Sequence, residues 1–388
     1  MENAHEDDTW DGISDEDILA VDLEQVEEQA TTSASTESTK KRYHTGSSKE
    51  DDSDLVIKMV KVDEELQDGS KPMHVPPLES LRGGYLWVSD ISSQIWCEQQ
   101  LEYRLSLPPD VIIPEPKAVT KGSELHLARE LEVQDYVNIK VTSSEDIFAV
   151  KVLNLLIVFK SILTHSSTVH REVPIFGVVD GVFILGKIDE VRVDDETFNL
   201  DIVDLKTRRY QRPPGKAQKI AHDAQVMLYK HLFDNLVRGF IPCHSLRVAL
   251  KLDLDRTLGE SVTKHICSSL TTLLSKDKKE DSWNLSQLLD ELRNAAESLP
   301  FINQLFIDYV WQESQQTFLM EEVKYDGVWL ENQMAKYLKY WKGERECQGV
   351  DVEDAWKCHS CDFQDGCKWI AKKTREHQLA RDRKNNTK

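Results

Sequence analysis

Apolar residues recur at helical spacing through much of the chain. Their period predicts helices over residues 88–105, 121–133 and 216–237, a helix or helix–strand unit over 146–164, and a mostly helical region over 283–345. Ser89 or Asp90 is placed to cap the first helix, and the break at Pro213-Pro214-Gly215 precedes the helix at 216.

Alternation of apolar and polar residues predicts strands near 173–193 and 197–207, and another over 246–254. Helices and strands in this order indicate an α/β fold with a mixed core and helices wrapped around it. The sequence shows no internal repeat and no glycine-rich phosphate loop, so a solenoid and a P-loop nucleotide site are not expected.

Composition separates an N-terminal tail from the rest. Residues 1–71 carry 21 acidic and 7 basic residues, and we expect them to form a disordered acidic tail. Residues 72–388 are expected to form a single domain with a basic C-terminal end. They hold 47 acidic and 41 basic residues, so the net charge of -20 is concentrated in the tail, and a local basic groove remains compatible with it.

Two cellular destinations are disfavoured by the same composition. No run approaches the roughly 20 apolar residues that span a bilayer, so we expect no membrane partner. An acidic start argues against a mitochondrial transit peptide, which would be rich in arginine and poor in acids.

The segment 186–206 reads as two strands joined by a polar turn at 194–197. The second strand places Phe198, Leu200 and Ile202 on one face, and Asp204 and Lys206 continue that face. Charges in a core-facing row are costly unless they have partners or a function. Asp189 lies near the same end of the preceding strand, and two carboxylates beside a lysine suit a divalent metal and a water nucleophile.

An exposed ion pair is the simpler interpretation of Asp-x-Lys, so the assignment depends on its surroundings. Gln225 and Tyr229 share one face of the following helix, where an amide and a phenol can orient a lysine or hold a phosphate. His126 and Glu130 are also spaced i, i+4, and a neutral imidazole can complete a metal site, although a lone histidine is more often structural. The basic residues between hairpin and helix suit a polyanionic substrate: Lys206, Arg208, Arg209, Arg212, Lys216 and Lys219.

Three cysteines close together give a second candidate metal site. Cys358, Cys361 and Cys367 form a C-x2-C-x5-C pattern, which leaves one ligand of a tetrahedral site open. Cys347 or His359 would make a local zinc knuckle, whereas Cys97 would join the two ends of the domain and close a long loop. Spacing alone does not decide between zinc and an iron–sulfur cluster.

Taken in order, these residues resemble the RecB-like branch of the PD-(D/E)xK nucleases, and most closely eukaryotic exonuclease V, the Dem1 family. That branch combines a histidine helix, a Gly-x-x-Asp strand, an acid-x-Lys strand and a Gln-x-x-x-Tyr helix. The matching positions are His126, Gly186 to Asp189, Asp204 to Lys206, and Gln225 to Tyr229. The segment from Gly177 to Asp180 is a rival match for the second element, and we prefer Asp189 because its strand is the one expected to pair with Asp204.

The resemblance covers roughly residues 80–370 and implies a restriction-endonuclease-like core, a mixed sheet flanked by helices, with helical wrapping and an iron–sulfur staple. It implies that His126, Asp189 and Asp204 hold Mg²⁺, or Mn²⁺, and that Lys206 orients the attacking water or stabilises charge. Gln225 and Tyr229 would shape the site. Cys97, Cys358, Cys361 and Cys367 would hold a [4Fe-4S] cluster, since iron–sulfur members place one cysteine before the core and three after it.

The implied activity is metal-dependent exonuclease digestion of single-stranded DNA from free ends, 5′ to 3′, in DNA repair. We expect a nuclear monomer, with the cytosol as the alternative compartment and a single-strand-binding protein as a further partner. Trp87, Trp96 and Tyr103 are candidates for base stacking, although core packing explains them more simply. The competing hypothesis is a non-catalytic, zinc-stabilised nucleic-acid-binding scaffold, which would purify colourless and contain zinc.

Overall fold

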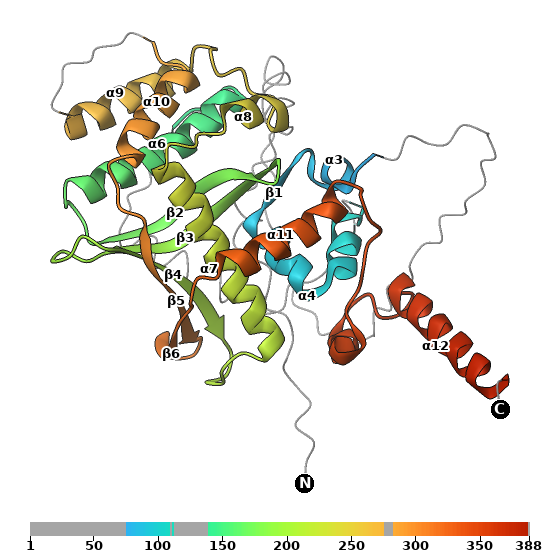
Figure 1. Ribbon diagram of the computed structural model, residues 1–388. Helices are drawn as coiled ribbons and strands as arrows, with labels where there is room; N and C mark the ends of the chain where they lie inside the picture. Colours follow the sequence, from blue (N-terminus) through green and yellow to red (C-terminus); the bar gives the residue numbers. More distant parts are fainter. Residues whose placement is uncertain (1–74, 109–110, 112–138, 275–281, 387–388) are drawn as a thin grey trace, which may run out of the picture.

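A mixed β-sheet with helices around it forms the centre of the molecule (Figure 1). The computed structural model describes residues 75–108, 111, 139–274 and 282–386. Its elements, in chain order, are α3 (Pro77–Arg82), β1 (Tyr85–Trp87), α4 (Val88–Leu105), α6 (Ser144–Leu163), β2 (Val169–Val179), β3 (Val182–Val193), β4 (Leu200–Arg208), α7 (Lys216–Val237), α8 (Cys243–Ala249), α9 (Glu260–Leu274), α10 (Leu285–Ala296), β5 (Ile302–Trp311), β6 (Gln316–Glu322), α11 (Gly327–Trp341), the 3-10 helix η1 (Val352–Ser360) and α12 (Lys368–Asn386).

The six strands follow the order β1-β3-β4-β5-β6, and β2 pairs with the remaining edge of β3. The β1–β3 and β4–β5 pairs are parallel, and the other pairs are antiparallel. A parallel pair needs a long crossover connection, and α7 to α10 form the one between β4 and β5. The expected mixed α/β core flanked by helices is thus confirmed.

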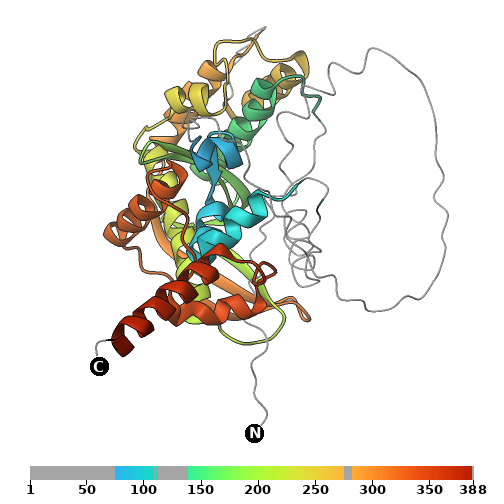
Figure 2. The ribbon, with the colours of Figure 1, turned by 90° about the vertical axis from the view of Figure 1, so that its right-hand side faces the viewer.

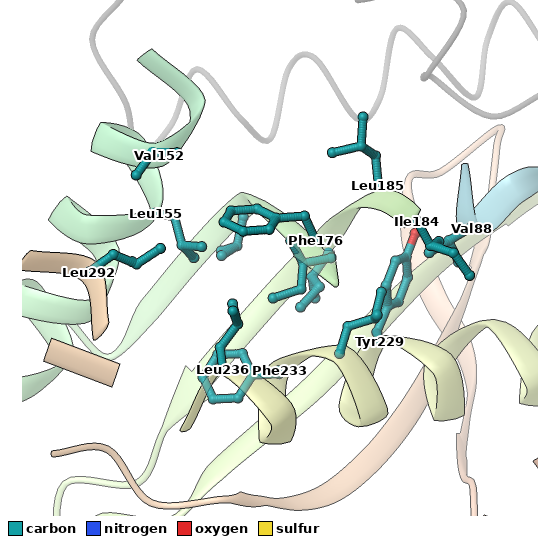
Figure 3. Close-up of a cluster of buried hydrophobic side chains, with 14 of the residues drawn as sticks. Val88, Val152, Leu155, Phe176, Ile184, Leu185, Tyr229, Phe233, Leu236 and Leu292 are labelled. Carbon is teal, nitrogen blue, oxygen red and sulfur yellow. The ribbon is translucent and has the colours of Figure 1, made fainter. Parts of the chain in front are cut away.

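Helix α7 lies across the sheet and links it to the helices on either side (Figure 1). It contacts β2, β4 and β5 as well as α4, α10 and α11. Figure 3 shows its side chains Tyr229, Phe233 and Leu236 in a cluster with residues of the strands and of α6. Because the side of α7 that faces the sheet is buried, its residues on that side are held in fixed positions.

Several predicted helices are confirmed. Helices α4 and α7 have the expected bounds, and α6 begins two residues before the predicted start. At the start of α4 the cap differs in detail, because the Asp90 carboxylate accepts a hydrogen bond from the Trp87 amide at 2.9 Å. The helix predicted over 121–133 lies outside the described residues. No described helix combines the length and apolarity that a bilayer crossing requires.

The strand predicted over 246–254 is wrong, because residues up to Ala249 form helix α8. The leucines and valine that suggested alternation do not share one face of a strand. Leu246 and Leu250 are buried at helical spacing, while Val248 between them is 64% exposed. The apolar residues that suggested one strand therefore belong to two different segments, the last turn of α8 and the non-helical residues that follow it.

The prediction of a mostly helical 283–345 was wrong in part. That region contains helices α10 and α11, but β5 and β6 lie between them. Apart from the buried carboxylate Asp308, the stretch from Leu305 to Val310 consists of apolar and aromatic residues, as suits a strand that is paired on both edges and largely buried. Such a central strand lacks the alternation that reveals half-buried strands.

The region 173–193 contains parts of two strands. Strands β2 and β3 are joined by a tight turn at Asp180 and Gly181, both with positive φ. The predicted polar turn at 194–197 is confirmed, because the Asp194 carboxylate accepts hydrogen bonds from the amides of Glu196 and Thr197.

Candidate active site

The candidate site lies where strands β3 and β4 separate. On one edge of β3 the ladder with β1 ends at Leu185, and the ladder with β4 ends at Glu190, which pairs with Val203. Continuing that register places Asp189 across from Asp204. The Leu205 amide donates to the Asp189 carboxylate at 2.6 Å, so a side chain takes the place of a main-chain partner at this position.

Asp204 is a buried carboxylate with an incomplete set of partners. Its exposed fraction is 0%, and neither carboxylate oxygen has a hydrogen-bond partner among the described residues. The Lys206 Nζ lies 3.0 Å from Asp204 Oδ2 and forms an ion pair with it. A buried carboxylate with lone pairs to spare is costly to keep ionised, and a bound cation would relieve that cost.

A chain of contacts leads from Asp204 into the core. The Lys206 ammonium also donates to Gln225 Oε1 at 3.0 Å, and Gln225 Nε2 donates to the Tyr229 hydroxyl at 3.1 Å. The sequence grouped all of these as site residues, and the structure brings them together. Tyr229, however, is 1% exposed and lies beside Val88 and Ile184 (Figure 3), so it positions Gln225 from behind.

Gly186 explains why a tyrosine fits at that point. A Cβ built on Gly186 would lie 2.8 Å from a methyl of Val88 and 2.9 Å from the ring carbon Cε1 of Tyr229. These separations are too short for real side-chain contacts, so only glycine allows the ring to pack here. The glycine of the Gly-x-x-Asp pattern and the tyrosine of the Gln-x-x-x-Tyr pattern thus pack against each other.

The two candidates for the first carboxylate occupy different places. Asp180 lies in the β2–β3 turn, where its side chain is 55% exposed and forms an ion pair with Lys342. Asp189 is on the strand that pairs with β4, near Asp204. The geometry favours Asp189. His126 and Glu130 lie outside the described residues.

His222 and Tyr309 were missed by the sequence interpretation. His222 Nδ1 and the Tyr309 hydroxyl are 3.1 Å apart, and Tyr309 pairs in register with Lys206 on the adjacent strand. Burial lowers the pKa of His222 well below its usual value, and the positive charges of Lys206, Arg208 and Lys219 lower it further. The imidazole is therefore neutral beside the lysine. The sequence feature that could have pointed to His222 is its position three residues before Gln225 on the same helix.

The basic residues after β4 divide into two groups. Arg208 donates to Gln218 at 3.2 Å, and Lys219 forms ion pairs with Asp223 and Glu321, so these side chains are already engaged. The exposed group surrounds Tyr210, which is 47% exposed and lies under the Arg209 guanidinium, and it comprises Arg209, Arg212 and Lys216. An exposed aromatic ring among cations is suited to a nucleic-acid strand.

Cys97 occupies a break in helix α4. Its φ of -163° and ψ of 107° are extended, so the helix is interrupted at this residue. Burial raises the pKa of the Cys97 thiol to about 11, and the charges of Cys361, Cys358 and Cys367 contribute to the rise. The four predicted cluster ligands are thus close enough to interact electrostatically.

Cys347, the local alternative for the fourth ligand, has a different partner. Burial raises the pKa of its thiol strongly, and a hydrogen bond to the Glu102 carboxylate raises it further. The Tyr340 hydroxyl donates to the same carboxylate at 3.2 Å. This geometry favours Cys97 over Cys347. Within the described residues, no group of three or more His, Cys, Asp or Glu side chains is placed so that it could hold a metal ion, so the thiols would have to move closer together to bind one.

The candidate base-stacking residues on α4 pack against the C-terminal segment instead. Trp96 is 3% exposed and meets Trp356 edge to face, and Tyr103 packs on Phe363. Trp87 is partly buried beneath the Lys151 ammonium. The simpler interpretation, core packing, thus describes Trp96 and Tyr103.

Comparison with known proteins agrees with this arrangement. A family model described as "Exonuclease V - a 5' deoxyribonuclease" matches residues 77–201 and 194–370. A curated protein named Exonuclease V from Danio rerio is 33% identical over 381 residues, covering 93% of this chain and 92% of that protein. A solved structure titled "Crystal structure of SSO0001" covers 74% of this chain and 87% of its own at 11% identity, but its TM-score of 0.30 is too low to indicate a shared fold. The two sequence matches span nearly the whole described structure, and the chain belongs to the exonuclease V family.

Proposed function

We propose that this protein is a metal-dependent exonuclease that digests single-stranded DNA from free ends, starting at 5′ ends, in nuclear DNA repair. Family membership supports a DNA exonuclease. The observation that supports a hydrolytic site is the set of contacts Asp204–Lys206–Gln225. Two contacts of 3.0 Å hold a carboxylate and an ammonium at the end of the β3–β4 pair where the two strands separate.

The residues present fit a divalent metal ion. Asp204 has two buried oxygens without hydrogen-bond partners, and Asp189 is placed opposite it, so together they offer hard oxygen ligands for Mg²⁺ or Mn²⁺. His126 is the proposed further ligand. When bound, the ion would polarise the scissile phosphate and lower the pKa of a bound water.

Lys206 supplies a fixed positive charge beside these carboxylates. Contacts with Asp204 and Gln225 hold its ammonium in one position, so it is preorganised to stabilise negative charge that develops on the phosphate. Gln225 is fixed in turn by Tyr229. The exposed cations around Tyr210 would hold the strand outside the site.

The four cysteines fit a structural [4Fe-4S] cluster. They come from α4 and from the segment that follows α11, and they form a set of interacting thiols. Cysteine thiolates are the usual ligands of such clusters. A cluster here would fasten the two ends of the described chain to each other.

Single substitutions at the site test the proposal. Asp204→Asn and Lys206→Met should each reduce kcat on single-stranded DNA in Mg²⁺ by at least about a hundredfold, the scale for losing a preorganised charge. Asp180→Asn is the matched control and should keep wild-type activity, because Asp180 lies in the distant turn. Thermal unfolding of each variant would verify that it folds.

Full activity in the Asp204 and Lys206 variants would refute this site, and loss of activity in Asp180→Asn would move the first carboxylate to the turn. Substrates labelled at the 5′ or 3′ end, single-stranded or duplex, test strand preference and polarity. A colourless protein with bound zinc that binds DNA without cleaving it would support the alternative scaffold function instead.

A further inference from the structure

Helix α12 is fixed at its first turn to the part of the molecule that carries the cysteines. The Lys368 amide donates to the Tyr103 hydroxyl at 2.8 Å, and the Trp369 indole donates to the Val350 carbonyl at 2.9 Å. A Cβ at Gly349 would collide with the Trp369 ring, so a glycine at this position allows the indole to lie against the backbone. The contacts of the first turn therefore determine the direction in which the helix leaves the molecule.

Beyond that turn the helix is open to solvent. Residues 374–385 are all exposed. Figures 1 and 2 show α12 leaving the body of the molecule, with the C-terminus near its far end. A helix that is polar on all sides gains no stability from a core, so its composition calls for another explanation.

The composition of α12 is strongly basic in a chain of net charge -20. It has seven lysines and arginines against two acidic residues, Glu376 and Asp382. One stripe contains no acidic residue and follows the spacing i, i+4, i+8, i+11, and it consists of Lys373, His377, Arg381 and Lys384, hereafter the basic stripe. It is about 16 Å long at 1.5 Å per residue. Lys373 forms an ion pair with Glu376 beside the stripe, whereas Arg381 and Lys384 are exposed and, at spacing i, i+3, repel each other, which disfavours the free helix.

We propose that the basic stripe of α12 binds the sugar–phosphate backbone of DNA outside the active site. This inference rests on the proposed function, which supplies the polyanion. A rigid rod with cations along one side matches evenly spaced phosphates, and the release of condensed counterions would favour binding without regard to sequence. Acidic protein segments are weaker competitors, since even residues 1–71 intersperse 7 basic residues among 21 acidic ones.

A pair of charge-matched variants tests the basic stripe. Arg381→Gln/Lys384→Gln removes two charges from it, and Arg375→Gln/Arg383→Gln removes two exposed charges from other sides of the same helix. Affinity for a long single-stranded oligonucleotide is measured over a range of salt concentrations without divalent metal. The slope of log K against log salt should become shallower by about 1.4 in the stripe variant, at about 0.7 per lost contact, and by less in the control. The kcat on an oligonucleotide just long enough to fill the active site should stay at the wild-type value.

Equal slopes in the wild type and the stripe variant would overturn the inference while leaving the exonuclease intact. Equal changes of slope in both variants would show that DNA responds to the overall positive charge of α12 and not to one side of it, and this result would also overturn the inference. Crosslinks from α12 to residues 1–71 that persist in saturating DNA would identify the chain's own acidic segment as the occupant. If the protein binds DNA with the expected slope change but cleaves none, the proposed function fails and the stripe stands.

Discussion

At Gly186 the absence of a side chain makes room for the residue that holds the Gln225 amide. The ring of Tyr229 approaches within 2.9 Å of where a Cβ would be, and its hydroxyl accepts a hydrogen bond from the Gln225 amide. Gln225 in turn holds Lys206. A change at a buried glycine should therefore affect both stability and chemistry.

Gly186→Ala should destabilise the protein by about 1 to 3 kcal/mol, because the ring of Tyr229 or the methyl of Val88 must move. It should also lower kcat, because Gln225 would lose its support. Urea unfolding and single-strand cleavage measure the two effects. Gly181→Ala is the control: it sits at φ +78° with nothing within 4 Å, so it should lose stability through backbone strain and keep full activity. Wild-type kcat in Gly186→Ala would contradict the argument.

Sequence reasoning grouped the candidate site residues but did not reveal all of their contacts. Asp204 and Lys206 follow from alternation along one strand, and their convergence with Gln225 is confirmed. The buried, supporting position of Tyr229 depends on a contact with Gly186, 43 residues earlier in the sequence, and spacing within one helix carries no information about that contact. The same holds for His222, whose partner Tyr309 is on a strand that the pattern did not reveal.

At the scale of elements, α7 brings the sheet, the lysine and a neutral histidine together. The pKa of His222 is lowered by burial and by Lys206, Arg208 and Lys219. The unfolded chain takes up a proton on this imidazole near pH 6.5, whereas the folded protein does so only at lower pH. The free energy of unfolding should therefore fall as the pH drops below 6.5, by up to about 1.4 kcal/mol per pH unit from this residue.

His222→Gln should remove that contribution, so the variant gains stability relative to wild type between pH 7.5 and pH 5. Denaturant unfolding at several pH values measures the difference. His170→Gln, on β2, should act in the same direction, because burial lowers the pKa of His170 as well. Parallel stability curves for His222→Gln and wild type would contradict the argument, because they would show that the pKa of this imidazole is the same in the folded and the unfolded chain.

The elements that could be predicted are those with a helical period and a marked boundary. Helices α4 and α7 carry apolar residues at helical spacing, and the breaks at Pro108-Pro109 and Pro213-Pro214-Gly215 mark the end of one and the start of the other. Strand β5 is paired on both edges and buried around Tyr309, so its sequence shows no period of two. Helix α8 has only seven residues, and its buried Leu246 together with Leu250, the residue that caps its end, also matches a strand pattern.

At the scale of the whole molecule, side-chain contacts join α4 to the segment after α11, in addition to the proposed cluster. The Glu98 carboxylate accepts hydrogen bonds from the two terminal guanidinium nitrogens of Arg345, Nη1 and Nη2, and from the backbone amide of Gln348. The Lys357 ammonium donates to the Trp96 carbonyl at 3.3 Å. The spacing of sequence motifs cannot reveal such contacts, because Glu98 and Arg345 are 247 residues apart and belong to no pattern.

Arg345→Met tests whether this clamp also holds the cysteine ligands in place. Glu98 is 4% exposed, so loss of its cation leaves a buried charge, and we expect a loss of about 3 to 5 kcal/mol in the free energy of unfolding. Because Glu98 follows Cys97 directly, the break in α4 should relax, and bound metal should be lost faster to a chelator. Cys361→Ser gives the reference for complete metal loss. Arg293→Met removes an exposed partner of Asp290 and should cost less than about 1 kcal/mol with unchanged metal retention. If Arg345→Met matches that control in both stability and metal release, the clamp is incidental, and the cysteines alone hold the ends of the fold together.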